Sequence, residues 1–176
     1  MQGPSAFCAR GATLKIEIRN VNYLAACSEE TSCFNATIYV DGKKVGTAQN
    51  HGHGGATMIR PSMVEQRINT YAATLPRAKG DLGDGHTFEY AQTAETLIDG
   101  LLTSFLIEKD LRGALSKRIL YTKKDAKGIF ETKALPAGER ARLITLPAFQ
   151  AKFQIDVILN AVPFDEALAI YKANGQ

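Results

Sequence analysis

The stretch FNATIYVDGKKVGTAQ, residues 34–49, decides the fold that we predict for this chain. Apolar and polar side chains alternate in its first half, which is typical of a strand with one buried face. Asp41-Gly42 follows directly and supplies the positive φ angles of a tight hairpin turn. The chain then returns over KKVGTAQ as a second strand. The side chains expected on the buried face are Phe34, Ala36, Ile38 and Val40.

Further strands and helices extend outward from this hairpin. LKIEIR, residues 14–19, alternates apolar and charged side chains, so we expect an antiparallel three-stranded unit over residues 13–49. Pro61 opens a helix that ends near Pro76, because proline is tolerated in a first helical turn. The apolar spacing predicts a long central helix from about Thr93 to Lys117.

The remainder of the chain predicts a second hairpin and a last helix. Residues 118–124 and 128–134 flank a turn-like DAK and read as two paired strands, while residues 76–90 read as an irregular loop. Residues 136–160 predict one or two short helices and a strand at Asp156 to Leu159, and residues 163–174 a final helix. We therefore predict one α+β domain, 1–176: an antiparallel N-terminal three-stranded unit and a second β-hairpin, packed with three to five helices.

Composition indicates a folded chain with an uneven distribution of charge. The 176 residues are 45% hydrophobic, with a formal net charge of +3. Residues 107–155 hold eleven basic and five acidic side chains, which favours either a solvated basic face or an acidic partner. No apolar run is long enough for a membrane span, so no membrane is expected. An odd number of cysteines and no export leader predict a cytoplasmic protein with reduced thiols.

The segment QNHGHGG, residues 49–55, is the first candidate for chemistry. Cys27, Cys33, His51 and His53 follow the spacing C-x5-C-x17-H-x-H, and thiolate and imidazole are preferred zinc ligands. The turn at Asp41-Gly42 would bring the cysteine and histidine ends together. The spacing matches no standard zinc pattern, so a buried cysteine beside exposed turn histidines is the alternative. A set of His51, His53 and His86 holding a catalytic metal is a further alternative.

The same glycines raise the question of an anion site. A glycine-rich turn before a helix can aim backbone amides at a phosphate or a carboxylate. GHGG followed by the helix at Pro61 fits this loosely, but neither G-x-x-x-x-G-K-[ST] nor G-x-G-x-x-G is present. Glycines that only form a tight turn are the alternative.

The second hairpin suggests nucleic-acid binding. Its cations combine with Tyr121 and Phe130, and such a ribbon can follow a phosphate backbone and stack bases. Both aromatic residues could equally form the core-facing side of the hairpin. The cations are Lys117, Arg118, Lys123, Lys124 and Lys127.

Two sequence blocks carry a resemblance to a known group of proteins. SEETSCFNATIYVDGKKVGTAQNHGHGG, residues 28–55, and ILNAVPFDEALAIY, residues 158–171, resemble small uncharacterised proteins of bacteriophages and other mobile elements. The two blocks cover under a third of the chain. The resemblance implies a cytoplasmic accessory protein and no particular reaction. It also implies that one surface contains Ser28, Glu29, Glu30, Thr31, Asn50 and Gly52.

We predict a non-enzymatic accessory protein that binds a protein of the host or defence machinery, with inhibition as the outcome that this source suggests. No cofactor is expected, and zinc is the candidate if there is one. The alternatives are a metal- or phosphate-dependent enzyme centred on His51 and His53, and a nucleic-acid-binding protein that uses the basic hairpin at 117–127. The candidate binding residues are Glu29, Glu30, Thr31, Asn50, His51, Gly52, His53, Lys123 and Lys124.

Overall fold

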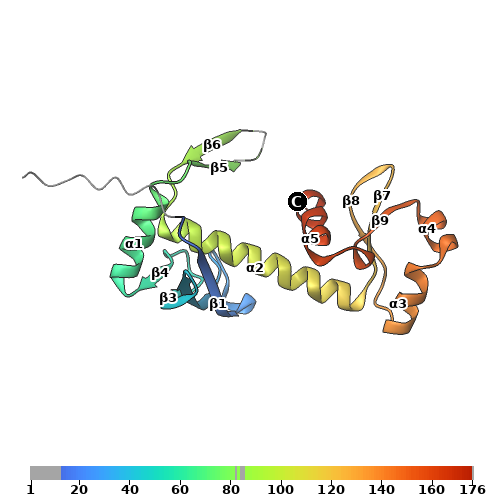
Figure 1. The fold of residues 1–176 in the computed structure, drawn as a ribbon, viewed down its shortest axis with the longest axis horizontal. Helices are drawn as coiled ribbons and strands as arrows, with labels where there is room; N and C mark the ends of the chain where they lie inside the picture. The colour runs from blue at the N-terminus through green and yellow to red at the C-terminus, as the bar shows by residue number, and fades with distance from the viewer. Residues whose placement is uncertain (1–12, 82, 84–85, 176) are drawn as a thin grey trace, which may run out of the picture. The chain divides into compact units, whose positions relative to one another are not determined.

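The computed structural model describes residues 13–81, 83 and 86–175. The chain divides into two compact units, the first ending at Leu102 and the second beginning at Thr103. This boundary lies inside the long helix α2, Ala94–Lys117 (Figure 1). The single domain over residues 1–176 stays a prediction, since two compact units can also fold together.

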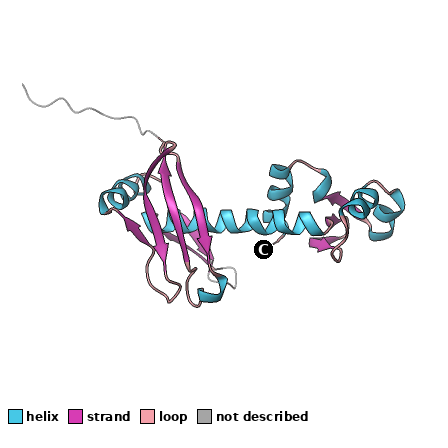
Figure 2. Ribbon diagram, turned by 90° about the horizontal axis from the view of Figure 1, so that it is seen from below, coloured by secondary structure: helices cyan, strands magenta, loops and turns pink. Residues whose placement is uncertain are grey.

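An antiparallel sheet, drawn in magenta in Figure 2, forms most of the first unit. It has four strands, in the order β1-β2-β3-β4. Its strands are β1 Ile16–Tyr23, β2 Phe34–Val40, β3 Lys43–Asn50 and β4 Met58–Arg60. The predicted three-stranded unit is confirmed. The sequence did not indicate β4, because three residues are too few to show an alternating pattern.

The turn at Asp41-Gly42 closes the central hairpin as predicted. Asp41 and Gly42 have φ angles of 51° and 78°. The Asp41 side chain adds a link to the first strand, because its Oδ1 accepts a hydrogen bond of 3.1 Å from the Lys15 amide. All four apolar side chains of β2 are buried, as expected from their alternation. The register sets Phe34 opposite Asn50, at the end of the hairpin farthest from the turn.

Two helices complete the core of the first unit. Helix α1, Ser62–Ala72, follows Pro61 and buries Val64, Ile68 and Ala72. The start of α2 is tied to it, since Asn69 Oδ1 accepts a hydrogen bond of 2.7 Å from the Ala94 amide. Between them, the segment predicted as an irregular loop contains a two-stranded hairpin, β5 Ala78–Asp81 and β6 Thr87–Tyr90. The prediction of an irregular loop was wrong, because strands of four residues among many turn-forming residues show no clear alternating pattern.

A three-stranded antiparallel sheet, in the order β8-β7-β9, organises the second unit. The predicted hairpin is present as β7 Leu120–Lys123 and β8 Ala126–Glu131, with β9 Ile155–Ile158 added to its other side. Its helices are α3 Ala137–Ile144, α4 Pro147–Phe153 and α5 Phe164–Asn174. Short 3₁₀ turns, η1 Ala25–Cys27 and η2 Leu159–Ala161, occur in the first and second units.

Aromatic packing and one asparagine hold the second unit together. Tyr121 is 5% exposed and contacts the rings of Phe130, Phe149 and Phe153 at centroid distances of 6.0, 6.4 and 6.0 Å. Asn160 joins the end of α2 to β7, since its amide nitrogen donates to the Leu115 and Arg118 carbonyls and its oxygen accepts from the Leu120 amide.

The structure confirms the α+β class. None of the helices in the described part of the chain has both the length and the apolar character that a membrane crossing requires.

The hairpin turn yields a first prediction about stability. Gly42 has a positive φ and open space around it, so Gly42→Ala meets only backbone strain and should lower the free energy of unfolding by about 1 kcal/mol. Gly100, in the helix of the same unit, also has open space, and Gly100→Ala should raise that free energy by about 1 kcal/mol. Urea denaturation measures both. If both substitutions changed the free energy of unfolding equally, the positive φ at Gly42 would not be what makes alanine unfavourable in the turn.

Candidate functional site

The hairpin brings two segments together at its open end. We call them the loop pair: residues 28–31, before β2, and residues 50–55, at the end of β3. The backbone amides of Glu29, Glu30 and Thr31 all donate to the Gly52 carbonyl, at 3.0, 3.0 and 3.3 Å. The predicted proximity of the cysteine and histidine segments is therefore confirmed.

Gly52 can make this contact only because it has no side chain. Its φ of +89° is rarely adopted by other residues. A β-carbon at this position would lie 2.0 Å from the Cys27 carbonyl oxygen and 2.9 Å from the Cys33 β-carbon. Gly52 thus packs so closely against Cys27 and Cys33 that no β-carbon fits between them.

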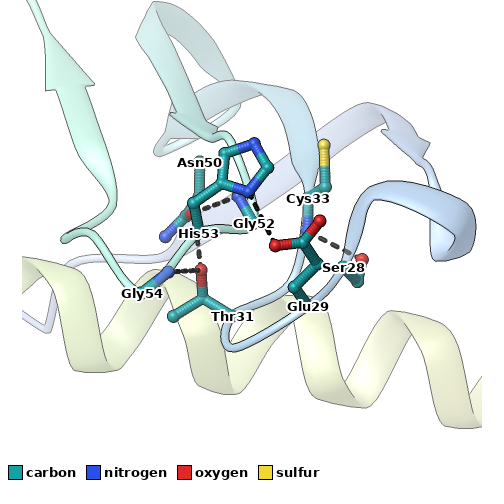
Figure 3. A network of polar contacts seen from close by, with 8 residues as sticks. All are labelled: Ser28, Glu29, Thr31, Cys33, Asn50, Gly52, His53 and Gly54. Carbon is teal, nitrogen blue, oxygen red and sulfur yellow. Dashed lines mark hydrogen bonds and ion pairs between the residues drawn. The ribbon is translucent and has the colours of Figure 1, made fainter.

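Asn50 is the polar centre of the loop pair (Figure 3). Its Oδ1 accepts hydrogen bonds from the Gly52 amide at 2.8 Å and from Thr31 Oγ1 at 2.9 Å, while its Nδ2 donates to the Gly55 carbonyl at 2.8 Å. Asn50 is only 6% exposed and Gly52 is also buried. Both lie beneath the surface and shape it, and direct binding of a partner by either residue stays a prediction.

A second set of hydrogen bonds fixes the far end of the glycine segment to α2. The Thr57 amide donates to Glu95 Oε1 at 2.7 Å, and Thr57 Oγ1 donates to Asp99 Oδ1 at 2.9 Å. Burial raises the pKa of Asp99, and the nearby Glu95 carboxylate adds to this, while the Thr57 hydrogen bond opposes both. These three residues were not among the predicted site residues, although the two carboxylates lie four positions apart and so share one face of a helix.

Charged side chains cover the outer surface of the loop pair. His53 Nδ1 lies 3.2 Å from Glu29 Oε2, with 65% and 68% of the two side chains exposed (Figure 3). Glu30 lies over Gly54, where a β-carbon would be 2.2 Å from its Oε2. His51 is exposed as well. A contact this exposed contributes little to stability, and the side chains stay accessible to a partner.

The two cysteines of this region carry free thiols, Cys27 exposed and Cys33 half-buried. Burial raises the pKa of the Cys33 thiol, and the neighbouring Cys27 thiol adds to this through its charge and a hydrogen bond. In the described residues, no three His, Cys, Asp or Glu side chains are grouped as a metal site would need. Zinc at Cys27, Cys33, His51 and His53 stays a prediction, with His53 turned toward Glu29 in this structure.

The glycine amides do not form the anion cradle that the sequence suggested. The Gly52 amide donates to Asn50, and the Gly54 amide donates to Thr31 Oγ1 at 3.3 Å. Strand β4 also separates these glycines from helix α1. Three amides do converge on one acceptor, but they belong to residues 29–31 and not to the glycines. Their acceptor is the Gly52 carbonyl oxygen and not an anion.

The basic hairpin of the second unit forms a separate candidate. Tyr121 is buried in the core, so the core-facing alternative holds for it and base stacking by this ring is excluded. Lys123 lies over the Phe130 ring, with its Nζ 4.1 Å from the ring centroid. Lys124 and Lys127 are exposed beside a surface hollow at the tip of the hairpin.

Comparisons of the chain with protein-family models, curated proteins and solved structures find no match. The resemblance to phage proteins stays a prediction from the two sequence blocks.

A second prediction concerns the close approach at Gly52. Gly52→Ala places a β-carbon against the Cys27 carbonyl at a positive φ, and should lower the free energy of unfolding by about 3 kcal/mol. Gly55→Ala meets open space and should change it by less than about 0.5 kcal/mol. Chemical denaturation compares the two variants. A Gly52→Ala protein as stable as Gly55→Ala would show that the two segments separate easily.

A third prediction follows from the raised pKa of Asp99. Between the unfolded and the folded pKa, the folded state keeps a proton that the unfolded state releases, so this residue's contribution to stability falls as the pH rises. Asp99→Asn removes the titration and keeps an oxygen that can accept from Thr57. Relative to wild type, the variant should therefore gain stability from acid to neutral pH. Urea denaturation across that range measures the difference, and a constant difference would refute the assignment.

Proposed function

We propose that this chain is a non-enzymatic binding protein whose loop pair contacts a protein partner. One observation carries the proposal: three consecutive amides hold the Gly52 carbonyl, so the exposed charged side chains stand on a fixed backbone. Pre-ordered groups lose less conformational entropy when a partner binds. The exposed Glu29 and Glu30 are the expected contacts.

The chemistry of the surface indicates the kind of partner. Two adjacent carboxylates on one short loop attract a basic patch, and complementary charge speeds association and selects among partners. The exposed imidazole of His53 lies beside Glu29, and both it and the exposed imidazole of His51 can donate or accept hydrogen bonds. A protein with a basic, hydrogen-bonding surface fits this arrangement best.

The biological setting of the proposal comes from the sequence resemblance alone. For a phage or mobile-element accessory protein, the expected partner is a component of the host or defence machinery, and binding would inhibit it. The nucleic-acid alternative is supported by the exposed Lys124 and Lys127 on the basic hairpin. The enzyme centred on His51 and His53 stays an alternative from the sequence.

The fourth prediction tests the loop pair by affinity capture from a bacterial host lysate. A photo-crosslinking amino acid placed at the exposed His51 should become joined to the captured protein. Glu29→Gln with Glu30→Gln should lower the captured amount by about tenfold, because two charge contacts are lost. Quantitative mass spectrometry of the captured protein measures this effect.

The matched control is Lys123→Gln with Lys124→Gln, which removes two charges from the second unit and should leave capture unchanged. Capture that depends on the lysines and disappears after nuclease treatment would instead support nucleic-acid binding. The role of the loop pair would be refuted if a protein were captured without a cross-link at His51. It would also be refuted if the glutamine variant captured as much protein as wild type.

A further inference from the structure

Cys27 and Cys33 lie at the two ends of one short segment beside the loop pair. Cys27 ends the 3₁₀ turn η1, and Cys33 directly precedes β2. Both carry free thiols, and Cys27 is exposed. Neither thiol is needed for the hydrogen bonds that hold Gly52, because the amides of Glu29, Glu30 and Thr31 supply those.

The backbone holds the two cysteines close to each other. Leu24 contacts both, since its carbonyl accepts from the Cys27 amide at 3.1 Å and its amide donates to the Cys33 carbonyl at 3.0 Å. Ser28 Oγ links the same residues, because it donates to the Leu24 carbonyl at 3.0 Å. It also accepts from the Cys33 amide at 2.8 Å (Figure 3). The Cys27 carbonyl and the Cys33 β-carbon also both lie against Gly52.

The closeness extends to a side-chain atom of Cys33, because a β-carbon on Gly52 would lie 2.0 Å from the Cys27 carbonyl oxygen and 2.9 Å from the Cys33 β-carbon. A disulfide requires neighbouring β-carbons and sulfurs that face each other, and residues whose backbones diverge cannot form one. In this pair the backbones are held near each other by their shared contacts with Leu24 and Ser28, as a disulfide needs.

We propose that Cys27 and Cys33 are a redox-active pair that forms a reversible intrachain disulfide by exchange with a small-molecule disulfide such as oxidised glutathione. The exposed Cys27 thiolate attacks one sulfur of the oxidised glutathione, which forms a mixed disulfide and releases one glutathione thiolate. The Cys33 thiolate then attacks the Cys27 sulfur and releases the second. The two cysteines are oxidised, the glutathione disulfide is reduced to two thiols, and the protons lost by the cysteines pass to water and to the released thiolates.

The disulfide would act directly on the loop pair. It would close a ring around residues 28–32, which include the three amides that hold the Gly52 carbonyl. A closed ring has fewer open conformations, so oxidation should fix Glu29 and Glu30 more firmly in place. This consequence for partner binding rests on the proposed function, whereas formation of the disulfide does not.

The fifth prediction tests the cysteine pair in the full chain with Cys8→Ser, which removes the third thiol. After incubation with oxidised glutathione, we expect a peptide joining Cys27 to Cys33 and about tenfold less alkylation of both thiols. A reductant should restore the alkylation. Further substitution of Cys33→Ser should leave glutathione attached to Cys27, because the second exchange is then blocked. Amide hydrogen exchange should slow at residues 29–31 on oxidation of the paired protein only.

Glutathione that stays attached to Cys27 when Cys33 is present would overturn the proposal, as would two thiols that remain fully alkylated. Partner capture by the oxidised and the reduced protein is measured separately. If the disulfide forms and no partner is captured in either state, the redox proposal stands and the proposed function fails. If a partner is captured and no disulfide forms, the reverse holds.

Discussion

The carbonyl oxygen of Gly52 accepts hydrogen bonds from three consecutive amides, and the arrangement of the loop pair depends on this contact. Three amides around one oxygen resemble the backbone cavities that bind anions elsewhere, but here the chain supplies its own acceptor. The contact requires a left-handed backbone and the absence of a side chain, which glycine alone provides without strain. Asn50 completes it by accepting from the Gly52 amide and from Thr31.

The hydrogen bonds of the loop pair continue into the helical part of the first unit. Asn50 lies next to Thr57, and Thr57 joins the glycine segment to the carboxylates of Glu95 and Asp99. Buried polar groups are costly unless they are paired, so such a set of bonds fixes one conformation rather than several. The exposed glutamates and histidines therefore stand on an ordered base, which is the physical ground for regarding them as a binding surface.

Much of the fold could be predicted because its periodic segments are long. The alternation in β2 and the Asp-Gly turn indicated the hairpin, and the apolar spacing indicated α2 within one residue of its start. The short elements β4, β5 and β6 escaped because three or four residues carry too little pattern. At the site, the predicted hairpin correctly indicated that the cysteine and histidine segments lie side by side. Sequence could not show that Asn50 is buried or that Thr57 binds Asp99, since both depend on the exact approach of segments distant in the chain.

The boundary between the two compact units falls within helix α2, between Leu102 and Thr103, and not in a loop. A protease or a gene truncation usually divides a protein at an exposed linker, where few hydrogen bonds are lost. Here a cut would interrupt a continuous helix and leave each fragment with one new helix end whose backbone groups lack their partners. Expression of either unit alone would therefore require a choice of how much of this helix to keep, because the boundary between the units coincides with no loop.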